Sequence, residues 1–223
     1  MRTVGLTSRR SQPSHATYAD RIVWQAASLT LSYPDTELVA RAPQIQDAIG
    51  EAAPNSLPLF TGLLQCWRTH PLSVLQTGYV DTFDMSRKYA LYLSYWTDGD
   101  TRRRGQVLTT FKQRYRSTGF LVNTRGELPD YLPLVLEYAA VADAPDGAEL
   151  LQQYRSSLEL LRLALTERDS PYAGVLTAVC DTLPGASPAD RREVLARAQA
   201  GPPTESVGLD SYDPRLLPLS ERS

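Results

Sequence analysis

The sequence predicts an all-α protein, a single globular helical bundle of about eight to ten helices with disordered termini. Apolar residues recur at helical spacing along most of the chain, and Pro, Gly and Asp stand where helices should begin or end. A length of 223 residues suits one domain with a sizeable core. We expect residues 1–16 to be a disordered extension, residues 17–200 to form the helical domain and residues 201–223 to be a flexible tail.

The first half of the chain has clear helix boundaries. Pro34 should end the first helix, because proline disfavours helix at the residue before it. Asp35 and Ser56 are N-cap residue types that would begin the second and third helices. A kink or break is possible at Pro43. The helices expected here span residues 17–33, 35–49, a segment that starts at 56, 71–83 and 87–96.

One segment of this half is ambiguous. Residues 90–96 are rich in aromatic side chains and could form a buried strand. A strand needs a partner, and none is visible elsewhere in the sequence. We therefore interpret this segment as a buried helix.

The second half continues the helical pattern. Gly99 and Asp100 should break the chain and then cap a long helix that ends at Gly119, and Asp130 should cap the next helix. The most strongly periodic segment, 147–167, is expected to be one helix. The helices expected here span residues 100–119, 130–139, 147–167, 172–182 and 188–200, with a loop at 120–129.

Composition excludes several functions. The net charge is −2, and acidic residues adjoin the run Arg102–Arg104, so we expect no nucleic-acid binding. The chain has two cysteines, Cys66 and Cys180, and two histidines, His15 and His70, too few for a Cys/His metal site. We predict reduced thiols and no bound cofactor or metal.

Enzyme motifs are missing as well. The sequence has no dinucleotide-binding glycine pattern, no phosphate-binding P-loop and no G-x-S-x-G nucleophile motif, so we predict that the protein is not an enzyme. Arg9 and Arg10 could suggest an export signal, but polar residues follow them. No apolar stretch approaches the roughly 18 residues of a membrane helix. We expect a cytoplasmic protein without direct membrane insertion.

Three stretches combine acidic, aromatic and proline residues. Each residue alone has a structural interpretation, such as an N-cap or an i,i+4 pair between Asp84 and Lys88. The stretches are YVDTFD at 79–84 with LYLSYW at 91–96, GDTRRRG at 99–105, and ELPDYLPLVLEY at 127–138.

In this order and spacing the stretches resemble the delta-subunit family of respiratory nitrate reductase, the NarJ-type molybdenum cofactor assembly chaperones. The resemblance covers about residues 20–180. It implies an all-helical cytoplasmic chaperone that binds the apo catalytic subunit of nitrate reductase, especially its N-terminal segment. The chaperone would hold that subunit for molybdenum cofactor insertion before membrane attachment.

Two alternatives remain open. One is a maturation chaperone for another molybdopterin oxidoreductase, of the dimethyl-sulfoxide or trimethylamine-oxide reductase type. The other is a small helical hydrolase. We expect a monomer or a weak homodimer.

A basic, amphipathic partner segment would suit a groove with apolar walls and an acidic rim. We expect the walls and rim to come from the first and third stretches. The candidate partner-binding residues are Tyr79, Asp81, Phe83, Asp84, Glu127, Asp130, Tyr131, Leu132 and Glu137.

Overall fold

The computed structural model describes residues 16–98, 102–119 and 126–200. Regular structure in these three segments is helical, which confirms the all-α prediction. The helices are α1 (Tyr18–Thr30), α2 (Thr36–Ala40), α3 (Ala42–Ala52), α4 (Leu57–Thr69), α5 (Leu72–Phe83), α6 (Leu93–Asp98), α7 (Arg102–Ser117), α8 (Leu132–Glu137), α9 (Ala144–Gln153), α10 (Arg155–Glu167), α11 (Ala173–Asp181) and α12 (Arg191–Ala200), with a 3-10 turn at Arg87–Tyr89 and a π-helical turn at Tyr138–Ala142.

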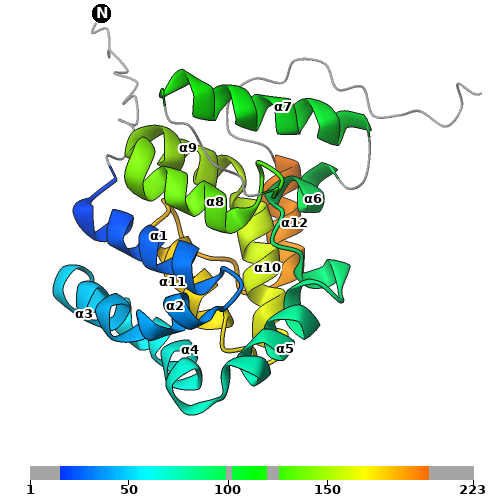
Figure 1. Ribbon diagram of the computed structural model, residues 1–223. Coiled ribbons are helices and arrows are strands. Elements are labelled where there is room, and N and C mark those ends of the chain that lie inside the picture. Colours follow the sequence, from blue (N-terminus) through cyan, green and yellow to red (C-terminus); the bar gives the residue numbers. More distant parts are fainter. Residues whose placement is uncertain (1–15, 99–101, 120–125, 201–223) are drawn as a thin grey trace, which may run out of the picture.

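The middle of the bundle is built around α1, α8, α10 and α11. In Figure 1, α7 runs along one edge of the molecule, and α3 and α4 lie at the opposite end. α1 packs on α8 and α3, α10 packs on α11, and α4 packs on both α3 and α11. Trp24 of α1 is 1% exposed, and its indole Nε1 donates a hydrogen bond to Thr182 Oγ1 over 2.8 Å. This contact ties the first helix to the end of α11.

Local sequence explains where the first helices begin. Thr17 and Asp20 form a capping box at α1, in which the Thr17 hydroxyl accepts from the Asp20 amide and the Asp20 carboxylate accepts from the Thr17 amide. Asp35 caps α2 as predicted and accepts from the Leu38 amide over 2.8 Å. The predicted helix 35–49 is broken at Arg41, two residues before Pro43, so the expected break near this proline is confirmed.

A glycine permits a very close approach between α4 and α11. A Cβ atom built on Gly174 would lie 2.0 Å from the backbone oxygen of Leu59, which is far inside van der Waals contact. Only the absence of a side chain lets these two backbones meet. This contact joins the α3–α4 end of the molecule to its centre.

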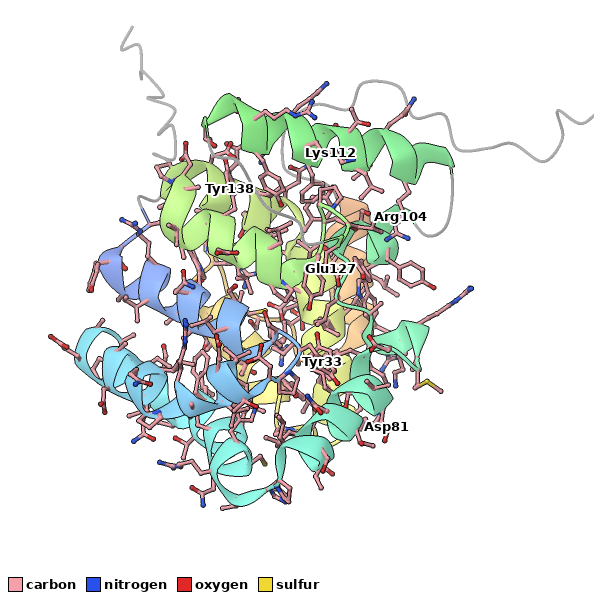
Figure 2. The ribbon with its side chains drawn as sticks, in the orientation of Figure 1. Tyr33, Asp81, Arg104, Lys112, Glu127 and Tyr138 are labelled. Atoms are coloured by element: carbon pink, nitrogen blue, oxygen red, sulfur yellow. The ribbon has the colours of Figure 1, made fainter. Side chains whose placement is uncertain are left out.

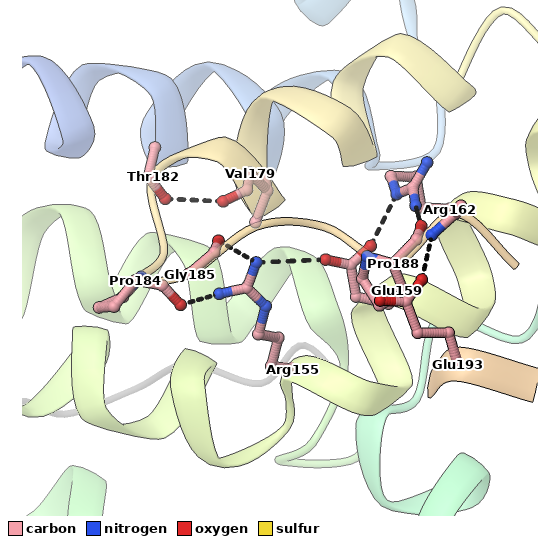
Figure 3. A network of polar contacts seen from close by, with 10 residues as sticks. Arg155, Glu159, Arg162, Val179, Thr182, Pro184, Gly185, Pro188 and Glu193 are labelled. Atoms are coloured by element: carbon pink, nitrogen blue, oxygen red, sulfur yellow. Dashed lines mark hydrogen bonds and ion pairs between the residues drawn. The ribbon is translucent and has the colours of Figure 1, made fainter. Parts of the chain in front are cut away.

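A buried carboxylate holds the C-terminal part of the bundle together (Figure 3). Glu159 of α10 is 1% exposed and accepts hydrogen bonds from Arg155 and Arg162. Each arginine also donates to backbone oxygens of the loop after α11: Arg155 to Pro184 and Gly185, and Arg162 to Pro188. The network fastens this loop, which leads into α12, across the surface of α10.

Two helix predictions were wrong in detail. Residues 87–96 do not form one helix: a 3-10 turn is followed by an extended piece that pairs with Tyr131, and α6 begins only at Leu93. The expected helix 147–167 is two helices, α9 and α10, that meet at Tyr154. In both cases contacts with distant segments outweigh the local helical pattern.

Two predicted roles of charged residues were also wrong. The expected pair between Asp84 and Lys88 is not formed, because Lys88 instead forms an ion pair with Glu167 of α10 at 2.9 Å. Asp130 does not cap α8, whose N-cap is Tyr131 and has no side-chain cap hydrogen bond.

Several predictions concern residues outside the described part of the chain. They are the predicted disorder of the N-terminal extension 1–16, of which only Ala16 is described, and the predicted capping role of Asp100. Most of the predicted loop 120–129 and the whole predicted tail 201–223 also lie outside the described residues. Within the described residues, no helix combines the length and the apolar character needed to cross a membrane.

Candidate functional site

The first and third sequence stretches meet through two tyrosines. Tyr79 lies on α5 and Tyr131 precedes α8, and their hydroxyl oxygens are 2.9 Å apart. The Tyr79 hydroxyl also donates to the backbone oxygen of Leu31 at the end of α1, over 3.0 Å. Burial raises the pKa of Tyr131 to about 12, so this hydroxyl is neutral at physiological pH. The first and third stretches therefore lie side by side at this pair.

Aromatic rings pack behind the pair. The rings of Tyr79 and Phe83 are 4.8 Å apart between centroids, and Phe83 lies at the same distance from Tyr172. Tyr79 and Phe83 are buried. Their rings therefore support the surface above them and contribute little to it.

Two carboxylates flank the tyrosines. Asp84 follows α5 and is exposed, and its pKa is raised by partial burial and by the nearby Glu127. Glu127 is exposed and accepts a hydrogen bond from the Tyr92 hydroxyl over 2.8 Å. Among the described residues, neither carboxylate forms an ion pair with a cationic side chain. The two like charges therefore lie near each other, and no described cationic side chain pairs with either of them.

We call the surface formed by Tyr33, Tyr92, Tyr131, Asp84 and Glu127 the acidic–aromatic face. Tyr33 is 47% exposed and packs edge-on against Tyr79, with 5.4 Å between centroids. The rings of Tyr92 and Tyr131 are 5.6 Å apart. Figure 2 labels Tyr33 and Glu127, which reach this face from separate parts of the chain.

The other predicted residues have different positions. Asp81 is exposed on α5, beside Arg168, which donates to its backbone oxygen over 3.3 Å. Leu132 is fully buried. Glu137 is exposed at the end of α8, and no contact within the described residues joins it to the tyrosines.

Asp130 is buried beneath the face. Its carboxylate accepts hydrogen bonds from the Ser94 hydroxyl over 2.6 Å and from the Ser94 amide over 3.1 Å. Arg104 of α7 lies 3.8 Å from the same oxygen. A fully buried carboxylate cannot touch a partner directly, so Asp130 fixes the geometry of the segments that carry the face.

Sequence reasoning missed Tyr33, Tyr92, Ser94 and Arg104. Tyr92 and Arg104 belong to stretches that were singled out, but no local pattern distinguishes them from their neighbours. Tyr33 falls at the end of the expected helix 17–33, but α1 ends at Thr30 and leaves Tyr33 exposed after it.

A second surface feature lies between α1 and α3. It is a hollow of about 240 Å³ with mainly apolar walls, and its lining residues include Ile22, Leu29, Gln44 and Ile45. Elsewhere, no three His, Cys, Asp or Glu side chains of the described residues gather closely enough to hold a metal ion.

The sequence matches the family described as "Nitrate reductase delta subunit" over residues 35–178. This range is well over half of the chain, and it contains all the residues of the acidic–aromatic face except Tyr33. The chain belongs to the nitrate reductase delta subunit family.

Two relatives agree with this membership. The chain is 44% identical over 161 residues to the "Nitrate reductase-like protein NarX" of Mycobacterium tuberculosis, covering 72% of this chain and 24% of that protein. It therefore spans about a quarter of the length of that relative. It is 36% identical over 159 residues to the "Probable nitrate reductase molybdenum cofactor assembly chaperone NarJ" of Bacillus subtilis, covering 70% and 85% of the two chains.

A solved structure shares the fold of this delta-subunit family member. It is a candidate redox enzyme maturation protein from Archaeoglobus fulgidus, with a TM-score of 0.55, 21% identity and coverage of 72% of this chain and 91% of that one.

Proposed function

We propose that this protein is a chaperone that binds the apo catalytic subunit of a respiratory nitrate reductase in the cytoplasm and holds it for molybdenum cofactor insertion. Family membership supports nitrate reductase as the enzyme that this protein serves. The name of the Bacillus subtilis relative supports the role in assembly. The protein acts by binding and not by catalysis.

The partner region that we propose is the N-terminal segment of the catalytic subunit. One observation carries this assignment: Asp84 and Glu127 lie near each other beside the half-buried Tyr92 and Tyr131, and no cationic side chain of the described residues forms an ion pair with either carboxylate. A basic side chain of a partner would supply the missing countercharge, and the rings of Tyr33 and Tyr131 would pack on its apolar neighbours. A basic, amphipathic segment fits both requirements.

This proposal reduces the predicted partner-binding site to its surface residues. We propose that the segment contacts the acidic–aromatic face, with Asp81 at its edge. Tyr79, Phe83, Asp130 and Leu132 support the face from below, because their side chains are buried.

Co-purification tests this function. The tagged protein is expressed together with the catalytic subunit, either intact or without its N-terminal segment, in cells that cannot make the molybdenum cofactor. We expect the intact subunit to be retained and the shortened one to be largely lost. Equal retention of both forms would contradict the proposal. Preferential retention of a dimethyl-sulfoxide reductase subunit would show that the partner is a different oxidoreductase.

A further inference from the structure

Among the described side chains of α7, Arg104 contacts the acidic–aromatic face through the ring of Tyr92. Its guanidinium carbon lies 5.8 Å from the ring centroid of Tyr92 and 5.7 Å from that of Tyr95, within the range of cation–π contacts. Its Nη2 atom lies 3.8 Å from the buried carboxylate of Asp130, and the side chain is 16% exposed. Figure 2 labels Arg104 near one end of α7.

Tyr92 connects Arg104 to the face itself. The ring that lies against the guanidinium also lies 5.6 Å from Tyr131, and its hydroxyl donates to Glu127 over 2.8 Å. The position of the Tyr92 ring therefore affects both an aromatic and an acidic member of the face. The planar guanidinium of Arg104 places a positive charge over this ring.

Asp130 provides a second connection. The Asp130 backbone oxygen accepts from the Leu93 amide over 3.0 Å, and the Leu132 amide donates to the Leu91 oxygen over 2.7 Å. These bonds hold the segment around Tyr92 against the segment around Tyr131, and the Asp130 carboxylate adds its two bonds to Ser94. Arg104 supplies the positive charge beside this buried carboxylate, and an uncompensated buried carboxylate would be costly.

We propose that Arg104 is a positioning residue of the acidic–aromatic face: held between Tyr92 and Tyr95 and beside Asp130, it keeps Tyr92 and Glu127 in the arrangement that binds the partner. This inference rests on the proposed function. It makes the affinity for the partner depend on α7, which contributes no residue to the face.

The experiment compares four variants with the full-length wild type: Arg104→Ala, Arg104→Lys, Glu127→Gln and the double variant of Arg104→Ala with Glu127→Gln. A synthetic peptide of the N-terminal segment of the catalytic subunit is titrated into each after circular dichroism has shown native helix content. Lys112→Ala is the matched control, because Lys112 is an exposed cation on the same helix.

We expect Arg104→Ala to weaken peptide binding about 10-fold and Lys112→Ala to change it less than about 2-fold. Arg104→Lys should bind more tightly than Arg104→Ala, because lysine keeps the charge beside Asp130 but loses the planar stacking. In the Glu127→Gln background, the loss caused by Arg104→Ala should shrink to about 2-fold, because there is no longer a charge to position. A residue that merely stabilises the fold would give the same loss in both backgrounds.

Each of the following results would overturn the inference. In the first, Arg104→Ala binds the peptide as tightly as Lys112→Ala does. In the second, Arg104→Ala loses the same affinity in the wild type and in the Glu127→Gln protein. Neither result contradicts the proposed function. A wild type that does not bind the peptide would overturn the proposed function and this inference together. If Arg104→Ala does not fold, Arg104→Lys and Tyr92→Phe take its place, each expected to bind about 3-fold more weakly, and unchanged affinity in both would refute the role.

Discussion

The Tyr131 hydroxyl donates its proton to the Tyr79 hydroxyl oxygen. The two oxygens are 2.9 Å apart, and the Tyr79 hydroxyl gives its own single proton to the Leu31 backbone oxygen. The chain of bonds thus runs from the segment before α8, through α5, to the end of α1. Three parts of the fold that are distant in sequence share it.

The direction of these bonds predicts unequal effects of removing each hydroxyl. Tyr79→Phe leaves both the Leu31 oxygen and the Tyr131 hydroxyl without a partner and should destabilise the protein by about 1–2 kcal/mol. Tyr131→Phe removes only a donor to a hydroxyl that keeps its other bond, and should cost about 0.5 kcal/mol. Urea unfolding measures both values, and a larger cost for Tyr131→Phe would reverse the assigned direction.

Partner binding should weaken as the pH is lowered from neutral. The pKa of Asp84 is raised by partial burial and by Glu127, so Asp84 takes up a proton at a higher pH than an ordinary aspartate does. Protonation removes the charge that attracts a basic partner, and a bound cation would in turn lower this pKa. The affinity for the peptide should therefore be highest at neutral pH, where Asp84 is ionised. It should fall as the pH is lowered toward the raised pKa of Asp84.

Calorimetric titrations of the peptide at a series of pH values, from neutral downward for as long as the protein keeps its helix content, check this expectation. Asp84→Asn is the control, since it cannot titrate and should bind more weakly with a flatter pH profile. Identical profiles for the wild type and this variant would show that another group is responsible.

A methyl group at position 174 should separate α11 from α4. The added Cβ atom would lie 2.0 Å from the Leu59 oxygen, and a backbone atom cannot move aside as a flexible side chain can. We expect Gly174→Ala to destabilise the protein by about 3 kcal/mol or more. Gly62→Ala on α4 is the matched control: nothing lies within 4 Å of its Cβ position, so it should be stabilising by up to about 1 kcal/mol. A Gly174→Ala protein as stable as the control would contradict this packing.

The charge of Glu159 should matter more than its size. Glu159→Gln leaves Arg155 and Arg162, both mostly buried, without their negative partner, and should cost about 2–3 kcal/mol in the free energy of unfolding. Glu167→Gln removes the exposed partner of Lys88 and should have little effect. Thermal unfolding of both variants compares the pairs directly, and equal melting temperatures would mean that the network of Figure 3 contributes nothing measurable.

Helix positions could be predicted wherever the apolar stripe and the boundary residue are local. Asp35 and its neighbours show this, because the cap, the break near Pro43 and the buried Ile45 and Ile49 are all visible within one short segment. The break at Tyr154 could not be predicted, because no proline or glycine marks it and the apolar pattern continues across it.

The site was harder to predict than the fold. The sequence pattern of Asp130 suggests an N-cap, yet its partners are Ser94 and Arg104, which lie 36 and 26 positions earlier in the chain. The bridge between Tyr92 and Tyr131 is likewise a non-local contact. Composition was sufficient to nominate the two stretches that form the face, but their burial and mutual contacts depend on tertiary structure.

Photo-crosslinking tests the location of the partner segment most directly. Tyr33, on the acidic–aromatic face, and Gln44, beside the hollow between α1 and α3, are replaced in turn by the crosslinking amino acid benzoylphenylalanine. Each protein is irradiated with the intact catalytic subunit, and the crosslinked peptides are identified by mass spectrometry. We predict crosslinks from position 33 to the N-terminal segment of the subunit and none from position 44. Crosslinks to that segment from position 44 alone would contradict the proposed face and place the partner between α1 and α3.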